Sequence, residues 1–195
     1  MNAVKRAVQA ALAAGLLVLG LGWVQEAGAL NNPDTMTVYV TPTGFTYAVS
    51  ITSPEVQGYD FSSVALAAST IATLAIPVAN TGNVSEYFAM KISNSLPDNW
   101  AAVATGTPGY NQFKLMGHFV GTGNGQPGDA TFSTTVDTMT STLGYGAGNF
   151  GQTVGSLIPP SGSNARDLWL KLVMPNSVVG TAQQQMTLTI NGQSN

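Results

Sequence analysis

The stretch Leu168-Trp169-Leu170-Lys171-Leu172-Val173-Met174 decides the fold class of this chain. Leucine or methionine stands at every second position, and Trp169, Lys171 and Val173 stand between them. Successive side chains of a β-strand point to opposite faces, so this alternation predicts a strand with one buried face.

The same two-residue period recurs along most of the chain. Turn-forming residues separate the runs, as in Pro42-Thr43-Gly44 and Asn80-Thr81-Gly82-Asn83. Only residues 60–70 fit a short helix as well as a strand. About eight to ten short strands with almost no helix predict an all-β fold, an antiparallel sandwich of two sheets. The inward-facing rows expected from the pattern lie in residues 36–40, 45–51, 72–78, 88–92, 113–119, 132–136, 168–174 and 186–190.

The first 29 residues have the order of a secretory signal peptide. Lys5 and Arg6 precede an apolar run, and Ala27-Gly28-Ala29 forms a small-residue cleavage signal. An uncleaved membrane anchor is the alternative, but the run is short for a bilayer and rich in alanine and glycine. We therefore expect a signal peptide over residues 1–29 and a single sandwich domain over residues 30–195. The product would be secreted or held at the cell surface, with the periplasm also open.

Charged residues are scarce and cysteine is absent. Charged residues make up 8 % of the chain, which has a net charge of −3, whereas about 25 % is usual in globular domains. The surface must then consist of Thr, Ser, Asn, Gln and Gly, and little repulsion opposes the approach of identical copies. So few basic residues make nucleic acid a poor partner. No disulfide can form and no lipid can be attached to a cysteine, and we expect no membrane span in the mature chain.

No catalytic or metal-binding motif stands out. His118 is the only histidine, which excludes a site of several histidines, and we expect it on the outward face of its strand with Lys114 and Met116. There is no Gly-x-Ser-x-Gly motif, and the acidic residues are scattered singly. Asp129, beside a glycine-rich loop, is the one faint candidate for calcium. We expect a protein that is not an enzyme and has no cofactor and no metal site.

Two long glycine-rich stretches, residues 121–129 and 144–162, are expected to be loops, where binding often occurs. Aromatic residues at outward or loop positions can contact a ligand or an interface, or they can pack beneath loops. The candidates for such contacts are Tyr39, Trp100, Tyr110, Tyr145, Phe150 and Trp169.

Several motifs together carry a family resemblance. Tyr59-Asp60-Phe61-x-x-Val64 precedes a strand and the turn Asn80-Thr81-Gly82-Asn83, and the chain closes with residues 168–172, Pro175 and residues 183–190. This pattern resembles secreted bacterial immunoglobulin-like domains, which implies an immunoglobulin-like β-sandwich. A leader followed directly by one sandwich is also similar to camelysin and TasA-like matrix-fibre subunits, which implies a structural or adhesive role without catalytic residues.

We therefore expect an exported, non-enzymatic structural protein, a self-assembling subunit of a cell surface, fibre or matrix. Its partners would be copies of itself or other surface proteins. Residues 35–41 would be free to pair with an open sheet edge of a neighbour. The alternative is an extracellular binding module, an adhesin for a glycan or surface ligand that uses the glycine-rich loops and exposed aromatic residues.

Overall fold

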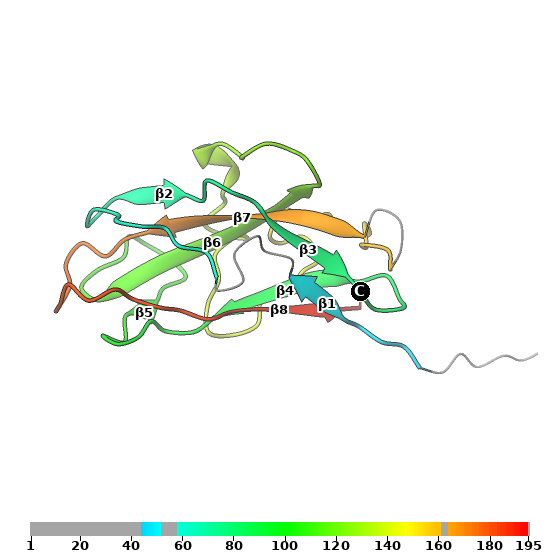
Figure 1. Ribbon diagram of the computed structural model, residues 1–195, viewed down its shortest axis with the longest axis horizontal. Helices are drawn as coiled ribbons and strands as arrows, with labels where there is room; N and C mark the ends of the chain where they lie inside the picture. The colour runs from blue at the N-terminus through cyan, green and yellow to red at the C-terminus, as the bar shows by residue number, and fades with distance from the viewer. Residues whose placement is uncertain (1–43, 52–57, 161–163, 195) are drawn as a thin grey trace, which may run out of the picture. The chain divides into compact units, whose positions relative to one another are not determined.

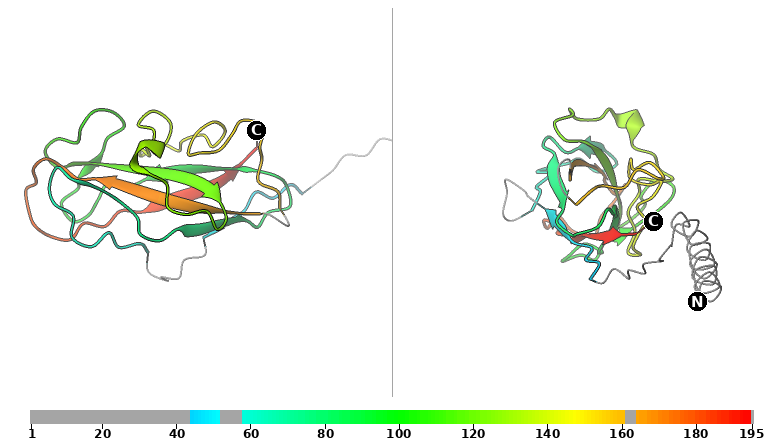
Figure 2. Two further views of the ribbon diagram at one scale, coloured as in Figure 1. Left: turned by 90° about the horizontal axis from the view of Figure 1, so that it is seen from above. Right: turned by 90° about the vertical axis from the view of Figure 1, so that its right-hand side faces the viewer.

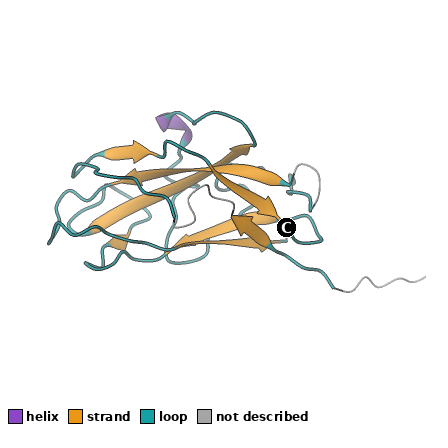
Figure 3. Ribbon diagram, in the orientation of Figure 1, coloured by secondary structure: helices purple, strands orange, loops and turns teal. Residues whose placement is uncertain are grey.

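The computed structural model describes residues 44–51, 58–160 and 164–194, which belong to a compact unit covering Thr43–Asn195. Apart from one 3-10 turn at Asp129–Thr131, every regular element in these residues is a strand (Figure 3). The prediction of an all-β protein is therefore confirmed. The strands are β1 (Val49–Ile51), β2 (Ser69–Ile71), β3 (Ile76–Asn80), β4 (Tyr87–Ile92), β5 (Ala101–Ala102), β6 (Gln112–Gly121), β7 (Ala165–Val173) and β8 (Leu188–Gln193).

The strands form two sheets (Figure 1). One has six strands. Five of them lie side by side in the order β1-β3-β7-β6-β5, and β2 pairs with β7 on the same edge as β3, nearer the end of β7. The other consists of β4 and β8, paired antiparallel. The short β5 runs parallel to β6, so the expectation of an entirely antiparallel arrangement is wrong at this edge. Figure 2 shows how strongly the larger sheet curls around the interior.

The centre of the larger sheet is the long antiparallel pair β6 and β7. Leu115 lies opposite Leu172, and Phe119 lies opposite Leu168. All four side chains are buried. The inward rows predicted for residues 113–119 and 168–172 are confirmed, because two alternating runs in register place their apolar side chains on one face.

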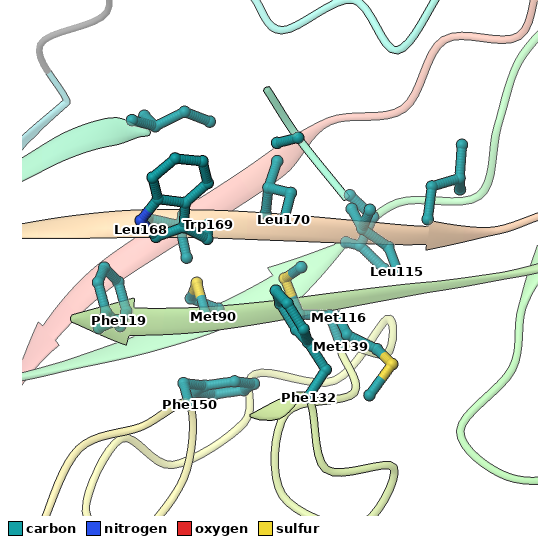
Figure 4. Packing of buried hydrophobic residues seen from close by; sticks show 14 of the residues in the cluster. Met90, Leu115, Met116, Phe119, Phe132, Met139, Phe150, Leu168, Trp169 and Leu170 are labelled. Carbon is teal, nitrogen blue, oxygen red and sulfur yellow. The ribbon is translucent and has the colours of Figure 1, made fainter. Parts of the chain in front are cut away.

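Strand β4 covers that face from the second sheet, as Figure 4 shows in part. The rings of Phe88 and Phe119 are 5.3 Å apart. Gly117 leaves room for a methionine from β4, since a Cβ at residue 117 would lie 2.8 Å from Cε of Met90. The inward row predicted for residues 88–92 is confirmed, and the main core lies between the two sheets.

The outward face of β6 and β7 is also covered, contrary to the expectation of a polar surface. Met116, Lys114 and Trp169 are all buried. Phe132 lies over this face, with its ring 6.0 Å from the ring of His118 and 6.0 Å from Nζ of Lys171. The strand predicted at residues 132–136 is wrong, because this segment follows the 3-10 turn as bends and turns that cap the sheet.

The edge formed by β2 and β3 is interrupted where one continuous inward row was predicted. Ile71 lies opposite Lys171 and Ile76 opposite Leu168, so extra residues bulge out between them. Leu74 is therefore half exposed. The Tyr59 hydroxyl stabilises the bulge by accepting a hydrogen bond from the Thr73 amide at 2.6 Å.

The loop that follows residue 144 connects the two sheets instead of extending into solvent. Gly144 pairs with Met90, and Ile158 pairs with Glu86. The buried side-chain amide of Gln152 takes the place of a neighbouring strand. Its oxygen accepts a hydrogen bond from the backbone N–H of Phe88 at 2.8 Å, and its nitrogen donates one to the backbone carbonyl of Phe88 at 2.7 Å. The loop thereby satisfies polar groups of β4 that would otherwise be buried without partners.

Candidate functional site

Strand β1 is an open edge with an exposed apolar row. It pairs with β3 through three residues, and no other strand of the described chain pairs with its opposite edge. Phe45, Tyr47 and Ile51 are between 43 and 63 % exposed, so the inward row predicted for residues 45–51 is wrong except at Val49, which is partly buried against the core.

The reason is the backbone around Thr46. The Thr46 amide donates to the Asn83 side chain at 2.7 Å, which ties this segment to a turn. A Cβ at residue 82 would collide with the Thr46 carbonyl, so Gly82 permits this contact. Held by the turn at the end of the sheet, the segment leaves Phe45 and Tyr47 exposed, and only Val49 of this row packs against the core.

A second open edge lies beside the first. Strand β8 pairs with β4, and within the described residues no backbone hydrogen bond joins β8 to β1. The two strands border a depression of about 260 Å³, and residues 44–51 and 188–194 contain no charged side chain. The depression is lined by Tyr47, Ala48, Val49, Ile190, Asn191 and Gly192. We call this region the β1–β8 groove.

Glu86 lies fully buried near this groove. Its carboxylate contacts Gly192 of β8, where a Cβ would overlap it. Neither carboxylate oxygen has a hydrogen-bond partner among the described residues. Burial raises the pKa of Glu86 from 4.5 to about 7, and the backbone of Ala48 lowers this pKa by a smaller amount.

Further exposed apolar side chains lie at the other end of the unit. Leu96, Tyr110 and Val179 are between 60 and 66 % exposed. The loops of Tyr110 and Val179 are joined, because Tyr110 forms a bridge with Ser177 and the Val179 amide donates to the Asn111 side chain at 2.9 Å. Leu96 lies on a third loop and forms a bridge with Gln185. We call Leu96, Tyr110 and Val179 the loop-end patch. Figure 1 shows that the loops before and after β5, and the loop after β7, lie at the opposite end from β1.

The five predicted contact residues that the structure describes do not form one surface. Tyr110 and Tyr145 are exposed, whereas Trp100, Phe150 and Trp169 are buried. The expected outward exposure of Trp169 is wrong, because its sheet face is covered. Tyr110 is in the loop-end patch, and the Tyr145 hydroxyl donates to the Ser194 carbonyl near the other end. Tyr39 lies outside the described residues.

His118 is part of a structural contact. Its Nδ1 lies 3.1 Å from Oδ2 of the buried Asp137, and the same oxygen accepts from the Ser133 amide at 2.8 Å. The other side of the ring packs against Gly151, where a Cβ would lie 2.8 Å from Nε2. Within the described residues, no hydroxyl group forms a hydrogen bond with this ring. The pair therefore fastens the segment of Ser133 to β6.

A second depression, of about 340 Å³, lies at the end of β6 and is lined in part by Asn124, Gln152 and Arg166. Within residues 44–51, 58–160 and 164–194, no three acidic or histidine side chains come together as a metal site requires. Asp129 binds Lys171 instead, with 2.7 Å between Oδ1 and Nζ.

No sequence pattern marks the loop-end patch, because Leu96 and Val179 stand among ordinary turn residues. Glu86 carried a faint sign, since it is a carboxylate directly before the buried run Tyr87-Phe88.

The fold and these sites define an all-β protein with two packed sheets and exposed apolar side chains at two ends. Comparison with protein-family models, curated proteins and solved structures found no match for this chain. Within the described part of the chain, no helix has the length and apolar character needed to cross a membrane.

Proposed function

We propose that this protein is an exported, non-enzymatic structural protein, whose subunits assemble with copies of themselves at a cell surface or in a fibre or matrix. The observation that carries this proposal is that two groups of exposed apolar side chains lie at opposite ends of the unit, while other exposed side chains such as Leu66, Leu74 and Val154 belong to neither group. Phe45, Tyr47 and Ile51 lie at one end, and the loop-end patch lies at the other. In this proposal the leader is removed after Ala29 and the sandwich is of the immunoglobulin-like type.

Two different apolar patches at opposite ends favour a contact that repeats. When one patch binds a different patch on the next copy, the contact is heterologous, and it continues as an open chain unless rotation closes a ring. Clustered apolar side chains on a soluble protein commonly mark an interaction surface. The low charge of the chain, 8 % of its residues, also removes the repulsion that keeps many proteins monomeric.

The alternative role as a glycan-binding module has less support. Stacking on sugar rings needs exposed aromatic faces close together. Of the described candidates, Trp100, Phe150 and Trp169 are buried, and the exposed Tyr110 and Tyr145 belong to different ends of the unit.

The test is the assembly state of the full chain after export. Electron microscopy and light scattering of the purified product should show filaments or a lattice. Phe45→Ser with Ile51→Ser should reduce assembly at least tenfold, and so should Leu96→Ser with Val179→Ser. The matched control is Val154→Ser, which removes an exposed valine outside both patches and should leave assembly unchanged. A product that stays monomeric at high concentration, or patch variants that assemble like the wild type, would refute the proposal.

A further inference from the structure

We propose that the β1–β8 groove is an acceptor site for residues 35–41 of a second copy of this chain, which add to it as an extended strand. This inference rests on the proposed function, because it names the contact that would join successive subunits.

Among the described residues, no other strand pairs with the edges of β1 and β8 that face the groove. An open strand edge presents unpaired N–H and C=O groups that an incoming strand can bind. Both β1 and β8 have such an edge toward the groove, with no hydrogen bond between them in the described chain. Proteins commonly block open edges with proline or with charged residues, especially lysine. Neither residues 44–51 nor residues 188–194 contain any of these.

The groove also offers an apolar lining beside its backbone edges. Val49 and Ile190 line it from the two strands, and Tyr47 stands at its border, 43 % exposed. An incoming strand that alternates apolar and polar side chains would place one row on this lining and leave the other row in solvent. Burying the exposed row of β1 in this way would also remove apolar surface from water.

Residues 35–41 have the composition that this site requires. The sequence Thr35-Met36-Thr37-Val38-Tyr39-Val40-Thr41 alternates apolar and hydroxyl-bearing residues and is uncharged. Its threonine, valine and tyrosine residues favour extended strands. Asp34 and Pro42 bound it on both sides, and a strand of seven residues spans about 23 Å, enough to follow all of β8.

A second copy is the favoured source of the strand because of how the contacts then repeat. Each chain would carry one donor segment and one acceptor groove, so every copy binds one neighbour and is bound by another. A segment that folded back on its own groove would leave each copy closed and monomeric.

The chain has no cysteine, so single introduced cysteines report the contact directly. Full chains carrying Val38→Cys and a first tag are mixed with chains carrying Val49→Cys and a second tag, and then oxidised. We expect a disulfide-linked product with both tags on a non-reducing gel. The control replaces the second partner by Val179→Cys, an exposed site outside the groove, and should give at least tenfold less product. Because the register is not fixed, Tyr47→Cys and Ile190→Cys serve as further acceptor variants.

The inference is wrong if no acceptor variant gives the mixed product. It is also wrong if the double variant Val38→Cys with Val49→Cys forms its disulfide only within one chain.

A second experiment separates this inference from the proposed function. Met36→Asp with Val38→Asp places charge on the donor row, keeps the cleavage signal, and should abolish assembly while leaving a folded monomer. Thr37→Asp, on the opposite row of the same segment, is the control and should assemble. Deletion of residues 30–40 should also leave a monomer. If these donor variants assemble while the patch variants do not, the strand inference fails and the proposed function stands. If the wild type does not assemble at all, the proposed function fails as well.

Discussion

Replacement of Glu86 by glutamine should change how the stability of this protein depends on pH. In the folded protein, burial raises the pKa of Glu86 from 4.5 to about 7. In the unfolded chain Glu86 therefore loses its proton near pH 4.5, whereas in the folded protein it keeps the proton up to about pH 7. Since the unfolded state then binds fewer protons, stability falls as the pH rises through this interval.

The magnitude follows from the difference in pKa. One pKa unit corresponds to about 1.4 kcal/mol, so the interval from 4.5 to about 7 corresponds to a loss of about 3 kcal/mol. This contribution is fully present below pH 4.5, is lost progressively up to about pH 7, and stays constant above it. Such a loss is a large part of the 5–15 kcal/mol that usually stabilises a domain.

The measurement is urea unfolding of the full chain at several pH values from 4 to 8. The difference in unfolding free energy between wild type and Glu86→Gln should change by about 2–3 kcal/mol over this range. The comparison of slopes matters more than the absolute values, because the glutamine amide would also be buried without partners. The control is Asp60→Asn, which changes an exposed carboxylate that accepts a hydrogen bond from the Ser62 amide. Its stability should depend on pH as that of the wild type does. If Glu86→Gln loses stability in parallel with the wild type, the carboxylate is not the source of the pH dependence.

Two further predictions concern the packing between the sheets, both measured by urea unfolding. Gln152→Leu leaves the Phe88 amide and carbonyl without their partners and should cost about 2–4 kcal/mol; a cost below about 0.5 kcal/mol would show that the loop does not complete this edge of β4. Gly117→Ala places a methyl group against Met90 and should cost about 1–3 kcal/mol. The cost should shrink in the background Met90→Ala, since the two sites are in contact, and purely additive costs would contradict this packing.

Sequence periodicity predicted the long strands well. The runs at residues 88–92, 113–119 and 168–172 lie in β4, β6 and β7, and their inward rows are buried as expected. Met174, the last member predicted for the third row, follows β7 and is partly buried. These strands are long, and each has a partner along most of its length. Period and tertiary pairing therefore agree.

The same reasoning failed at the sheet edges. Residues 45–51 and 132–136 have good alternation, yet the first gives a short strand with most of its row exposed and the second gives no strand. Alternation shows which residues share a face, but it does not show whether another layer covers that face. Leu74 is a similar case, since the alternation does not reveal the bulge beside β7.

The candidate site could be predicted only in part. The low charge and the uncharged strand segments were visible in the sequence. The burial of Trp100, Phe150 and Trp169 was not, because neither a loop position nor the outward face of a strand shows what packs over the side chain. The β1–β8 groove lies between strands that are far apart along the chain, so no local pattern marks it.

The sequence by itself determined that this chain is an all-β protein and which rows of side chains lie together, because both follow from a period of two along one strand. The tertiary structure decided which faces are covered, which edges stay open and where Glu86 is buried. Those features depend on contacts between distant segments, such as Gly192 with Glu86 and Gln152 with Phe88. Their energies arise when separate layers meet, and no single strand contains that information.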